Sequence, residues 1–350
     1  MSEAKERKIH YDILRILAAF SVVMLHSAAQ WWYDVDLRSI KWIIANTYDV
    51  MFRFGVPVFV MISGAIFLDK KYKLDVNRLY KHNIVRLIVF YIIWSCAYGL
   101  FDCRYLNLQE MGVKGVLREM LYGRYHLWFI PMIVGIYVLL PILRGWIDNT
   151  SKKNIEYFLV VFFVLQICGE TVKALTVSDE LHYIINLGKV EMACGYIGYF
   201  VLGYYISHIG IKERLKQIIY ILFVPSVLLN VILGILLSWK VNRPVGTIYD
   251  SFGLFTFIIV LNIFIFVSEK KEKTKFGSNL QKIVREISDD TLGIYVLHVG
   301  IIEYTQLIVK QNMKVSILVG IPIYAIVCFT VSALVAAILR RIPFVGRFLC

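Results

Sequence analysis

Apolar stretches of about 20 residues recur along this chain and constrain its fold more than any other feature. They fall at 12–33, 42–68, 83–101, 126–146, 155–173, 191–208, 217–239, 248–268, 289–309 and 316–339. A helix needs about 20 apolar residues to cross a bilayer, and in lipid the backbone must satisfy its hydrogen bonds within helices or a closed barrel. With 59% hydrophobic and 18% charged residues, the chain is not an ordinary soluble enzyme. We therefore predict an all-α polytopic membrane protein with about ten transmembrane helices.

The ten stretches leave little room for a second folded unit in a chain of 350 residues. The sequence predicts a single integral membrane domain over 1–350, with short tails. The first apolar stretch is too long for a signal peptide and is expected to be a span. Between the third and fourth stretches, the segment GVKGVLREMLYG is typical of a short amphipathic helix on the membrane surface.

The net charge of +13 suits the cytoplasmic loops of a membrane protein, so no nucleic-acid partner is predicted. Lysine and arginine are about twice as frequent in the segments that share a side with the N-terminus as in the opposite segments. This bias predicts that both termini are cytoplasmic. The six cysteines contain no CxxC pair and lie mostly in apolar stretches, so neither a disulfide framework nor a metal site is expected.

Two ionisable residues lie in the first apolar stretch, where charge is expensive and therefore suggests function. Arg15 and His26 are eleven positions apart, which brings them within about 20° of one helix face and roughly 16 Å apart along the axis. We interpret this face as one wall of a polar tunnel. The alternative is that Arg15 reaches the lipid headgroups and His26 makes a hydrogen bond between helices.

Other ionisable residues in the spans are predicted to form two layers across the membrane. The outer layer holds His26, Arg53, Glu170 and Glu303, and the inner layer holds Arg15, Arg86 and His298. Asp49 is an i,i+4 partner for Arg53, and a structural ion pair would also explain those two residues.

Histidine is the natural candidate for proton transfer near neutral pH, because the chain lacks the GxxxxGK[ST], HExxH and GxSxG motifs. His26 and His298 lie clearly within spans. The other five histidines are expected in loops or at span boundaries, with solvated roles; they are His10, His82, His126, His182 and His208. The basic segment RLYKHNIVR, with Arg78 and Arg86, fits a phosphorylated cytosolic ligand, and the positive-inside rule explains it equally well.

A series of segments resembles the acyltransferase family 3 membrane proteins, in particular the short ten-helix members. The segments are YDILRILAAFSVVMLHS, VPVFVMISGAIFL, RLYKHNIVRLIVFY, YHLWFIPMIVGIYVLLPIL, GYIGYFVLGYYIS and TLGIYVLH. Members of this family are bacterial O-acyltransferases that modify cell-surface glycans and related molecules. One departure is Val299, which follows His298 where family members often have proline.

The resemblance implies transfer of an acetyl group from acetyl-CoA to a hydroxyl of a glycan, lipid-linked sugar or similar acceptor. It also implies a multi-pass protein of the bacterial plasma membrane, in contact with membrane lipids. Arg15 and His26 match the essential pair of the family, with the Ser63–Gly64 turn and Arg86 in supporting positions.

These residues suggest a mechanism in which cytosolic acetyl-CoA reaches His26 along the first span. The donor site is predicted to contain Arg15, Arg86, Arg78, Ser63 and His298. His26 is the expected general base on the acceptor hydroxyl, with an acyl-histidine relay as a variant. Arg53 is expected near the developing oxyanion, and Glu303 or Glu170 would orient His26 or the acceptor. Trp128 and Phe129 would stack on a sugar ring or anchor the interface.

Two other classes of function remain open on the sequence. A transporter or flippase also places buried charges in layers, although the chain shows no matched pair of Gly/Pro-broken segments in two halves. A non-catalytic membrane subunit or sensor would use the basic C-terminal segment LRRIPFVGRFLC as a docking tail.

Overall fold

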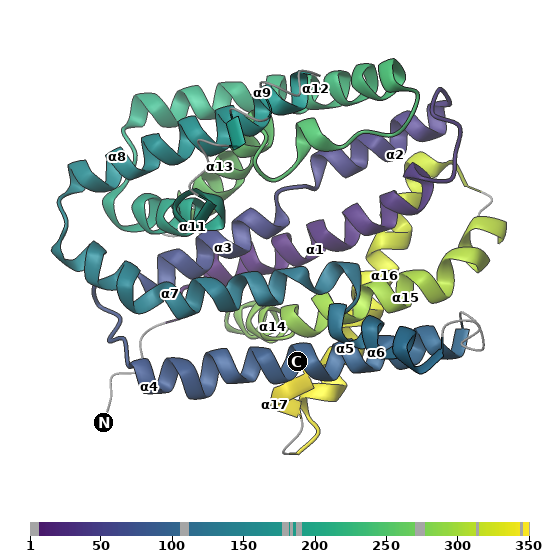
Figure 1. Cartoon of the computed structure of the whole chain (residues 1–350), viewed down its shortest axis with the longest axis horizontal. Coiled ribbons are helices and arrows are strands. Elements are labelled where there is room, and N and C mark those ends of the chain that lie inside the picture. The colour runs from purple at the N-terminus through teal and green to yellow at the C-terminus, as the bar shows by residue number, and fades with distance from the viewer. Residues whose placement is uncertain are drawn as a thin grey trace.

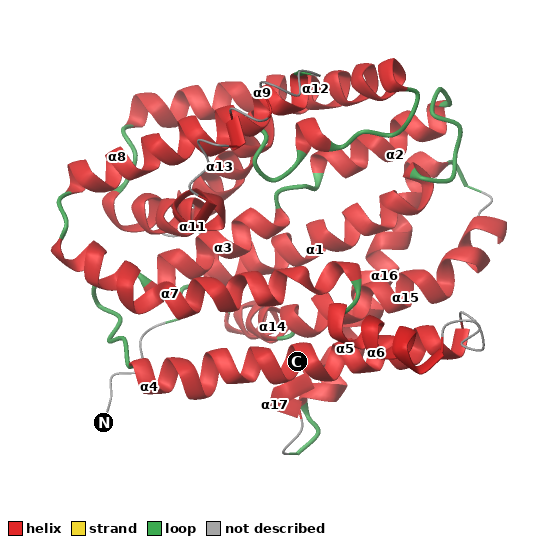
Figure 2. Cartoon of the chain, viewed as in Figure 1, coloured by secondary structure: helices red, strands yellow, loops and turns green. Residues whose placement is uncertain are grey.

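The fold was analysed in a computed structural model of the chain. The structure describes residues 7–105, 112–176, 182, 185–186, 191–269, 277–312, 315–343 and 346–349. Within these ranges the regular structure is helical, joined by loops and turns (Figure 2). The predicted all-α class is therefore confirmed for the part of the chain that the structure describes.

The helices of the first half begin with α1 (Ile9–Trp32), and Figure 1 shows most of the long helices running lengthwise across the view. They continue as α2 (Ile40–Met51), α3 (Gly55–Phe67), α4 (Val76–Arg78), α5 (Val85–Tyr105), α6 (Gly112–Tyr122), α7 (Phe129–Asn149), α8 (Lys152–Phe162) and α9 (Gly169–Leu175). Single π-helical turns over Leu79–Ile84 and Phe163–Cys168 join α4 to α5 and α8 to α9.

The second half contributes six long helices and a short terminal one. They are α11 (Glu191–Tyr204), α12 (Glu213–Val241), α13 (Leu254–Glu269), α14 (Ser278–Asp289), α15 (Thr291–Asn312), α16 (Ile317–Arg340) and α17 (Gly346–Leu349). All ten apolar stretches of the sequence are largely helical within the described residues. Eight helical segments are long and apolar enough to cross a membrane, and those over 191–208 and 289–309 are not among these eight. The chain is thus a polytopic, all-α membrane protein.

Contacts between distant segments group the loops at two ends of the bundle. At one end, long-range contacts join Arg7 to Asp289 (2.7 Å), Arg144 to the carbonyl of Asp69 (2.7 Å), Lys216 to Glu269 (2.6 Å) and Arg340 to Asp290 (2.9 Å). At the other end, Trp239 donates to the carbonyl of Leu37 (3.2 Å). The first end gathers the basic segments that the sequence assigns to the cytoplasm, and we call it the inner end.

The second apolar stretch is broken into two helices around Arg53. Helix α2 ends at Met51, α3 begins at Gly55, and the residues between them form a turn. Pro57 has no backbone N–H and so cannot bond to the carbonyl of Arg53 four residues earlier, which removes one helical hydrogen bond at this point. The break places Arg53 at a helix discontinuity inside the bundle.

Helices α3 and α11 pack with their backbones in close contact, at two glycines. A Cβ atom at Gly64 would collide with the carbonyl oxygen of Phe200, and one at Gly203 would collide with that of Met61. Small residues allow helices to approach in this way, and van der Waals contact then stabilises the pair in lipid. Ser63 and Gly64 lie within α3, so the turn predicted at these residues is wrong.

Two amphipathic helices lie outside the set of long spans. The amphipathic helix predicted between the third and fourth spans is α6, and its Met120 packs near Gly99 of α5. Helix α14 is seen end-on in Figure 1, across the direction of most long helices. The hydroxyl of Ser288, near the end of α14, donates to Asp12 of α1 (2.8 Å). This contact fixes α15, which follows directly, beside the first turns of α1.

Candidate active site

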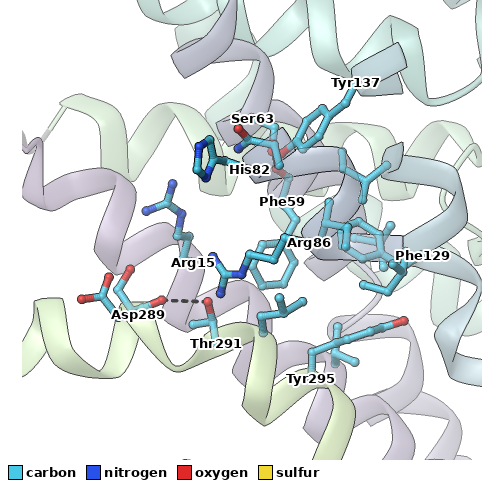
Figure 3. A pocket seen from close by; sticks show the side chains of 18 residues that line it. Arg15, Phe59, Ser63, His82, Arg86, Phe129, Tyr137, Asp289, Thr291 and Tyr295 are labelled. Carbon is cyan, nitrogen blue, oxygen red and sulfur yellow. Dashed lines mark hydrogen bonds between the residues drawn. The ribbon is translucent and has the colours of Figure 1, made fainter. Parts of the chain in front are cut away.

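A cavity of about 310 Å³ opens between α1, α3, α5, α7 and the α14–α15 junction. Arg15, Arg86 and His82 line it, and Figure 3 shows their nitrogen-bearing side chains gathered in one part of the cavity. Two guanidinium groups and an imidazole make this part suited to phosphate, because guanidinium forks bind phosphate oxygens bidentately. We call this space the arginine cavity.

Arg15 is held at the cavity by a buried carboxylate. Asp12, one helical turn earlier in α1, is fully buried and lies 3.4 Å from Nη1 of Arg15. The same carboxylate pairs with Arg7 at 2.7 Å and accepts the hydroxyl of Ser288. Asp12 therefore shares its charge with Arg7, and the long contact leaves Arg15 free to use its remaining donors in the cavity.

Arg7 also reaches Asp289, a lining residue of the arginine cavity, at 2.7 Å. Partial burial acts to lower the pKa of Arg7, but Asp12 and Asp289 outweigh it and raise the pKa above its ordinary value. Arg7 is thus a permanent cation that ties the start of α1 to the α14–α15 junction. The pairing also neutralises part of the negative charge beside the cavity.

The cavity is bounded on another side by two aromatic residues, Phe129 and Tyr295 (Figure 3). The Tyr295 hydroxyl donates to the backbone carbonyl of His126. Its ring centroid lies 5.7 Å from that of His126 and 6.1 Å from that of His298. Tyr295 therefore separates the arginine cavity from a cluster of histidines.

Three histidines from three helical segments meet beyond Tyr295. The rings of His26 and His298 have centroids 5.1 Å apart, and those of His126 and His298 are 5.6 Å apart. His26 comes from α1, His298 from α15, and His126 from a 3₁₀ turn just before α7. We call these residues the histidine cluster.

This arrangement corrects two predictions. His298 was predicted in the inner layer with Arg15, but its ring lies against that of His26. The reason is that α14 ends beside Asp12, which is already one turn into α1. Helix α15 therefore begins further into the bundle than α1 does. His126 is 2% exposed, not solvated, because the turn that carries it packs against α15.

Backbone carbonyls orient two of the three rings. His298 Nδ1 lies 3.2 Å from the carbonyl oxygen of Ile294, and His126 Nε2 lies 3.3 Å from that of Val296. A carbonyl accepts, so these ring nitrogens carry the hydrogen when the rings are neutral. The other nitrogens, Nε2 of His298 and Nδ1 of His126, have no hydrogen-bond partner within the described residues. Each is then a proton acceptor held in a fixed orientation.

The arginine cavity follows α1 from Arg15 to Val22 and does not include His26. Arg15 lines the arginine cavity and His26 does not, and Val22, one turn before His26, is the lining residue of α1 nearest to it. Tyr295 lines the cavity, and its ring lies beside those of His126 and His298. Arg15 thus belongs to the arginine cavity and His26 to the histidine cluster.

Arg53 lies near the histidine cluster, at the break between α2 and α3. Its Nη2 pairs with Asp49 at 2.7 Å, which confirms the predicted i,i+4 ion pair. The guanidinium also covers the ring of Tyr249, with its carbon 5.4 Å from the ring centroid. Arg53 is close enough to His26 to interact with it electrostatically. A fixed cation is therefore available at the cluster.

The two glutamates of the predicted outer layer have different surroundings. Glu303 pairs with Arg124 at 2.5 Å, next to the turn that carries His126. Glu170 pairs with Lys173 at 3.3 Å and lines a separate cavity at the end of the bundle opposite the inner end, which we call the outer end. Glu303 thus flanks the turn of the histidine cluster, whereas Glu170 belongs to another region of the bundle.

Three further candidates are placed as follows. Ser63 lines the arginine cavity together with Arg15 and Arg86. Arg78 is exposed and lies outside the residues that line this cavity. Trp128 is 47% exposed, and its ring centroid lies 5.7 Å from that of Tyr196. The structure therefore brings Ser63 into the donor region predicted from the sequence and leaves Arg78 outside it.

Sequence reasoning did not single out Asp12, His126 and Tyr295, although all three shape this region. A buried acid one turn from Arg15 and the tyrosine one turn before His298 were visible as helical spacings. His126 gave a weaker signal, since it lies at the edge of an apolar stretch, where sequence alone does not distinguish interfacial from buried residues.

Comparison with known proteins places this site in a family. No curated protein and no solved structure matches the chain. The acyltransferase domain of acyltransferase family 3 matches residues 9–341, a range that contains the arginine cavity and the histidine cluster. The chain therefore belongs to the acyltransferase 3 family and is a membrane-bound member of it.

Proposed function

We propose that this protein transfers an acetyl group from cytosolic acetyl-CoA to a hydroxyl of a cell-surface glycan, a lipid-linked sugar or a similar acceptor. The main support is a cavity lined by two arginines and by Tyr295, whose ring in turn lies beside two of the three clustered histidines. Cations that suit phosphates and imidazoles that accept protons are the two parts such a reaction requires. Membership of an acyltransferase family supplies the reaction class.

The donor binds in the arginine cavity, with its phosphates on Arg15 and Arg86 and with Ser63 along the wall. Arg78 has no part in this site, because it is exposed and outside the cavity. The thioester lies near Tyr295, at the boundary with the histidine cluster. The arm of the donor passes into the cluster when the Tyr295 side chain moves aside.

His26 is the general base in this proposal. Its imidazole takes the proton from the acceptor hydroxyl while the oxygen attacks the thioester carbonyl. The tetrahedral oxyanion forms near Arg53, whose charge stabilises it. The carbon–sulfur bond then breaks, the imidazolium returns its proton to the leaving thiolate, and the products are the acetyl ester and CoA.

His298 supports this step rather than the binding of the donor. Its Nε2 is unpartnered within the described residues, and its ring is held against that of His26 by the carbonyl of Ile294. In this position it orients the base or receives the proton from it. Glu303, through Arg124, positions the turn of His126 at the edge of the cluster.

Acetyl-CoA binding and CoA release by the purified protein test the proposal. We expect His26→Ala to bind acetyl-CoA as the wild type does and to lose turnover with a cell-envelope glycan fraction. Wild-type turnover in a folded His26→Ala protein would rule out its role as the base. Arg15→Lys is expected to weaken donor binding while the melting temperature stays near the wild-type value.

A carrier or flippase is the alternative, because a second cavity lies at the opposite end of the bundle. Product formation in detergent separates the two functions. A transferase forms acetyl ester without a sealed compartment, whereas a carrier needs one. Acceptor-dependent release of CoA in detergent would therefore support the transferase.

A further inference from the structure

A second cavity, of about 420 Å³, lies at the outer end of the bundle. Its walls are the end of α9, the end of α12 and the loop that leads into α13. These segments lie at the opposite end from the contacts of Arg7, Arg144 and Arg340. The volume lies within the range of small-molecule sites, about 300–1,000 Å³. We call it the outer cavity.

Three cations from different segments line the outer cavity: Lys173, Lys240 and Arg243. Lys173 is balanced by Glu170 at 3.3 Å and also contacts the side-chain oxygen of Asn186 at 2.9 Å. Lys240 and Arg243 are exposed and make no ion pair within the described residues. Besides the Lys173–Glu170 pair, the charged lining residues of the cavity are thus Lys240, Arg243 and the carboxylate of Asp250.

The backbone fixes where these two cations lie. Asn242 has a φ of 50°, a left-handed conformation that ends α12 and reverses the chain. The N–H of Arg243 then donates to the carbonyl of Ser238 (3.2 Å), and that of Val245 donates to the Ser238 hydroxyl (2.9 Å). These hydrogen bonds stabilise the turn, and the turn holds Lys240 and Arg243 at one rim of the cavity.

The loop 247–253 forms the floor of the outer cavity and connects it with the proposed active site. Asp250 and Phe252 line the cavity, while Tyr249 lies under the guanidinium of Arg53 at 5.4 Å. Asp250 also interacts electrostatically with Arg53. A ligand bound on this floor is thus separated by the loop from Arg53, the cation that we place at the oxyanion.

Aromatic rings extend this floor. The ring centroid of Phe252 lies 4.8 Å from that of Tyr196, which in turn lies 5.7 Å from that of Trp128. Aromatic faces beside carboxylates and cations suit a ligand that has both an apolar ring face and polar substituents, which describes a sugar. With three cations and two carboxylates among its described lining residues, the cavity has one net positive charge, which favours a sugar that carries a negative charge.

We propose, building on the proposed function, that the outer cavity is the acceptor site and that the acceptor is an anionic sugar. Lys240 and Arg243 bind its carboxylate or phosphate group. The ring packs on Phe252, and Asp250 and Glu170 accept hydrogen bonds from its hydroxyls. Donor and acceptor then approach the histidine cluster from opposite ends of the bundle.

The probes are glucose 6-phosphate and glucuronate, with glucose as the uncharged reference. Binding is measured by thermal shift on the full-length protein in phosphatidylcholine nanodiscs. We expect both anionic sugars to raise the melting temperature of the wild type more than glucose does. The double variant Lys240→Gln/Arg243→Gln is expected to bind them about tenfold more weakly, because two charge-assisted contacts are lost.

Lys153→Gln/Arg214→Gln is the matched control, since it removes the same charges from exposed positions at the inner end. We expect it to bind the anionic sugars as the wild type does. Equal binding by the two double variants, or no preference of the wild type for either anionic sugar over glucose, would overturn the inference.

A lipid headgroup offers the same phosphate chemistry, so the experiment is repeated in nanodiscs that contain phosphatidylglycerol. Persistence of the sugar effect supports an acceptor site, and its disappearance assigns the two cations to lipid and overturns the inference. An acetyl-CoA titration of the same samples tests the proposed function separately. Intact donor binding without discrimination between charged and neutral sugars would contradict the acceptor assignment alone.

Discussion

The imidazole rings of His26 and His298, which are 272 positions apart in the sequence, lie with their centroids 5.1 Å apart. One ring belongs to the first span and the other to α15, and α14 fixes their relative depth through the contact between Ser288 and Asp12. Such a pair of imidazoles, one fully buried and one partly exposed, is suited to proton transfer.

His298→Gln is expected to lower kcat about 100-fold, since a positioned general base contributes on the order of 10²–10⁴ and His298 orients it. The affinity for acetyl-CoA should stay at the wild-type value, because His298 lies outside the arginine cavity. CoA release and equilibrium binding give the two quantities. His208→Gln is the control, because that histidine contacts the carbonyl of Ala65 (2.7 Å) at the inner end and its replacement keeps a donor there. A tenfold loss of affinity for acetyl-CoA in His298→Gln would show instead that His298 belongs to the donor site, as the sequence predicted.

Arg15→Gln and Arg86→Gln are each expected to raise the Kd for acetyl-CoA about tenfold or more, because each removes a charge-assisted contact with phosphate. Arg78→Gln removes the same charge from an exposed position outside the cavity and should leave the Kd unchanged. Calorimetry on the purified proteins measures all three. Equal effects at the three positions would indicate a diffuse electrostatic attraction rather than a built site.

Tyr295→Ala is expected to join the arginine cavity to the histidine cluster, because it removes the ring that separates them. A cysteine introduced as His26→Cys, in a background without other reactive cysteines, reports this opening through its rate of modification by a small soluble thiol reagent. We expect a rate increase of about tenfold or more in Tyr295→Ala, because an open path replaces a packed ring.

Tyr295→Phe is the matched control for that experiment. It keeps the ring and loses only the hydrogen bond to the His126 carbonyl, so modification should stay slow. If the two variants react at equal rates, the ring is not the barrier between the two spaces.

Gly64→Ala is expected to destabilise the protein by about 1–3 kcal/mol or more, because the added methyl group collides with the backbone of Phe200 and the two helices must separate. Gly135→Ala is the matched control, since no neighbouring atom lies within 4 Å of a Cβ atom built there. Thermal unfolding in one detergent compares the variants. A melting temperature of Gly64→Ala equal to that of Gly135→Ala would contradict the close contact between α3 and α11.

Sequence periodicity predicted the helical class, the approximate limits of the apolar stretches and the pairing of Asp49 with Arg53. These properties depend on residues close in the chain: a run of apolar side chains defines a span, and an i,i+4 spacing defines a pair. The sequence also placed Arg15 and His26 on one helix face, because the angle per residue of a helix is nearly constant.

Only the tertiary structure decided which side chains from different helices meet. The depth of His298 depends on how far α14 folds toward α1, and the burial of His126 depends on the turn that packs beside α15. Likewise, helix packing places the ring of Tyr295 both in the lining of the arginine cavity and beside His126. The length of an apolar stretch and the spacing of residues along one helix do not determine the relative depth or rotation of two packed helices. These contacts therefore follow only from the three-dimensional structure.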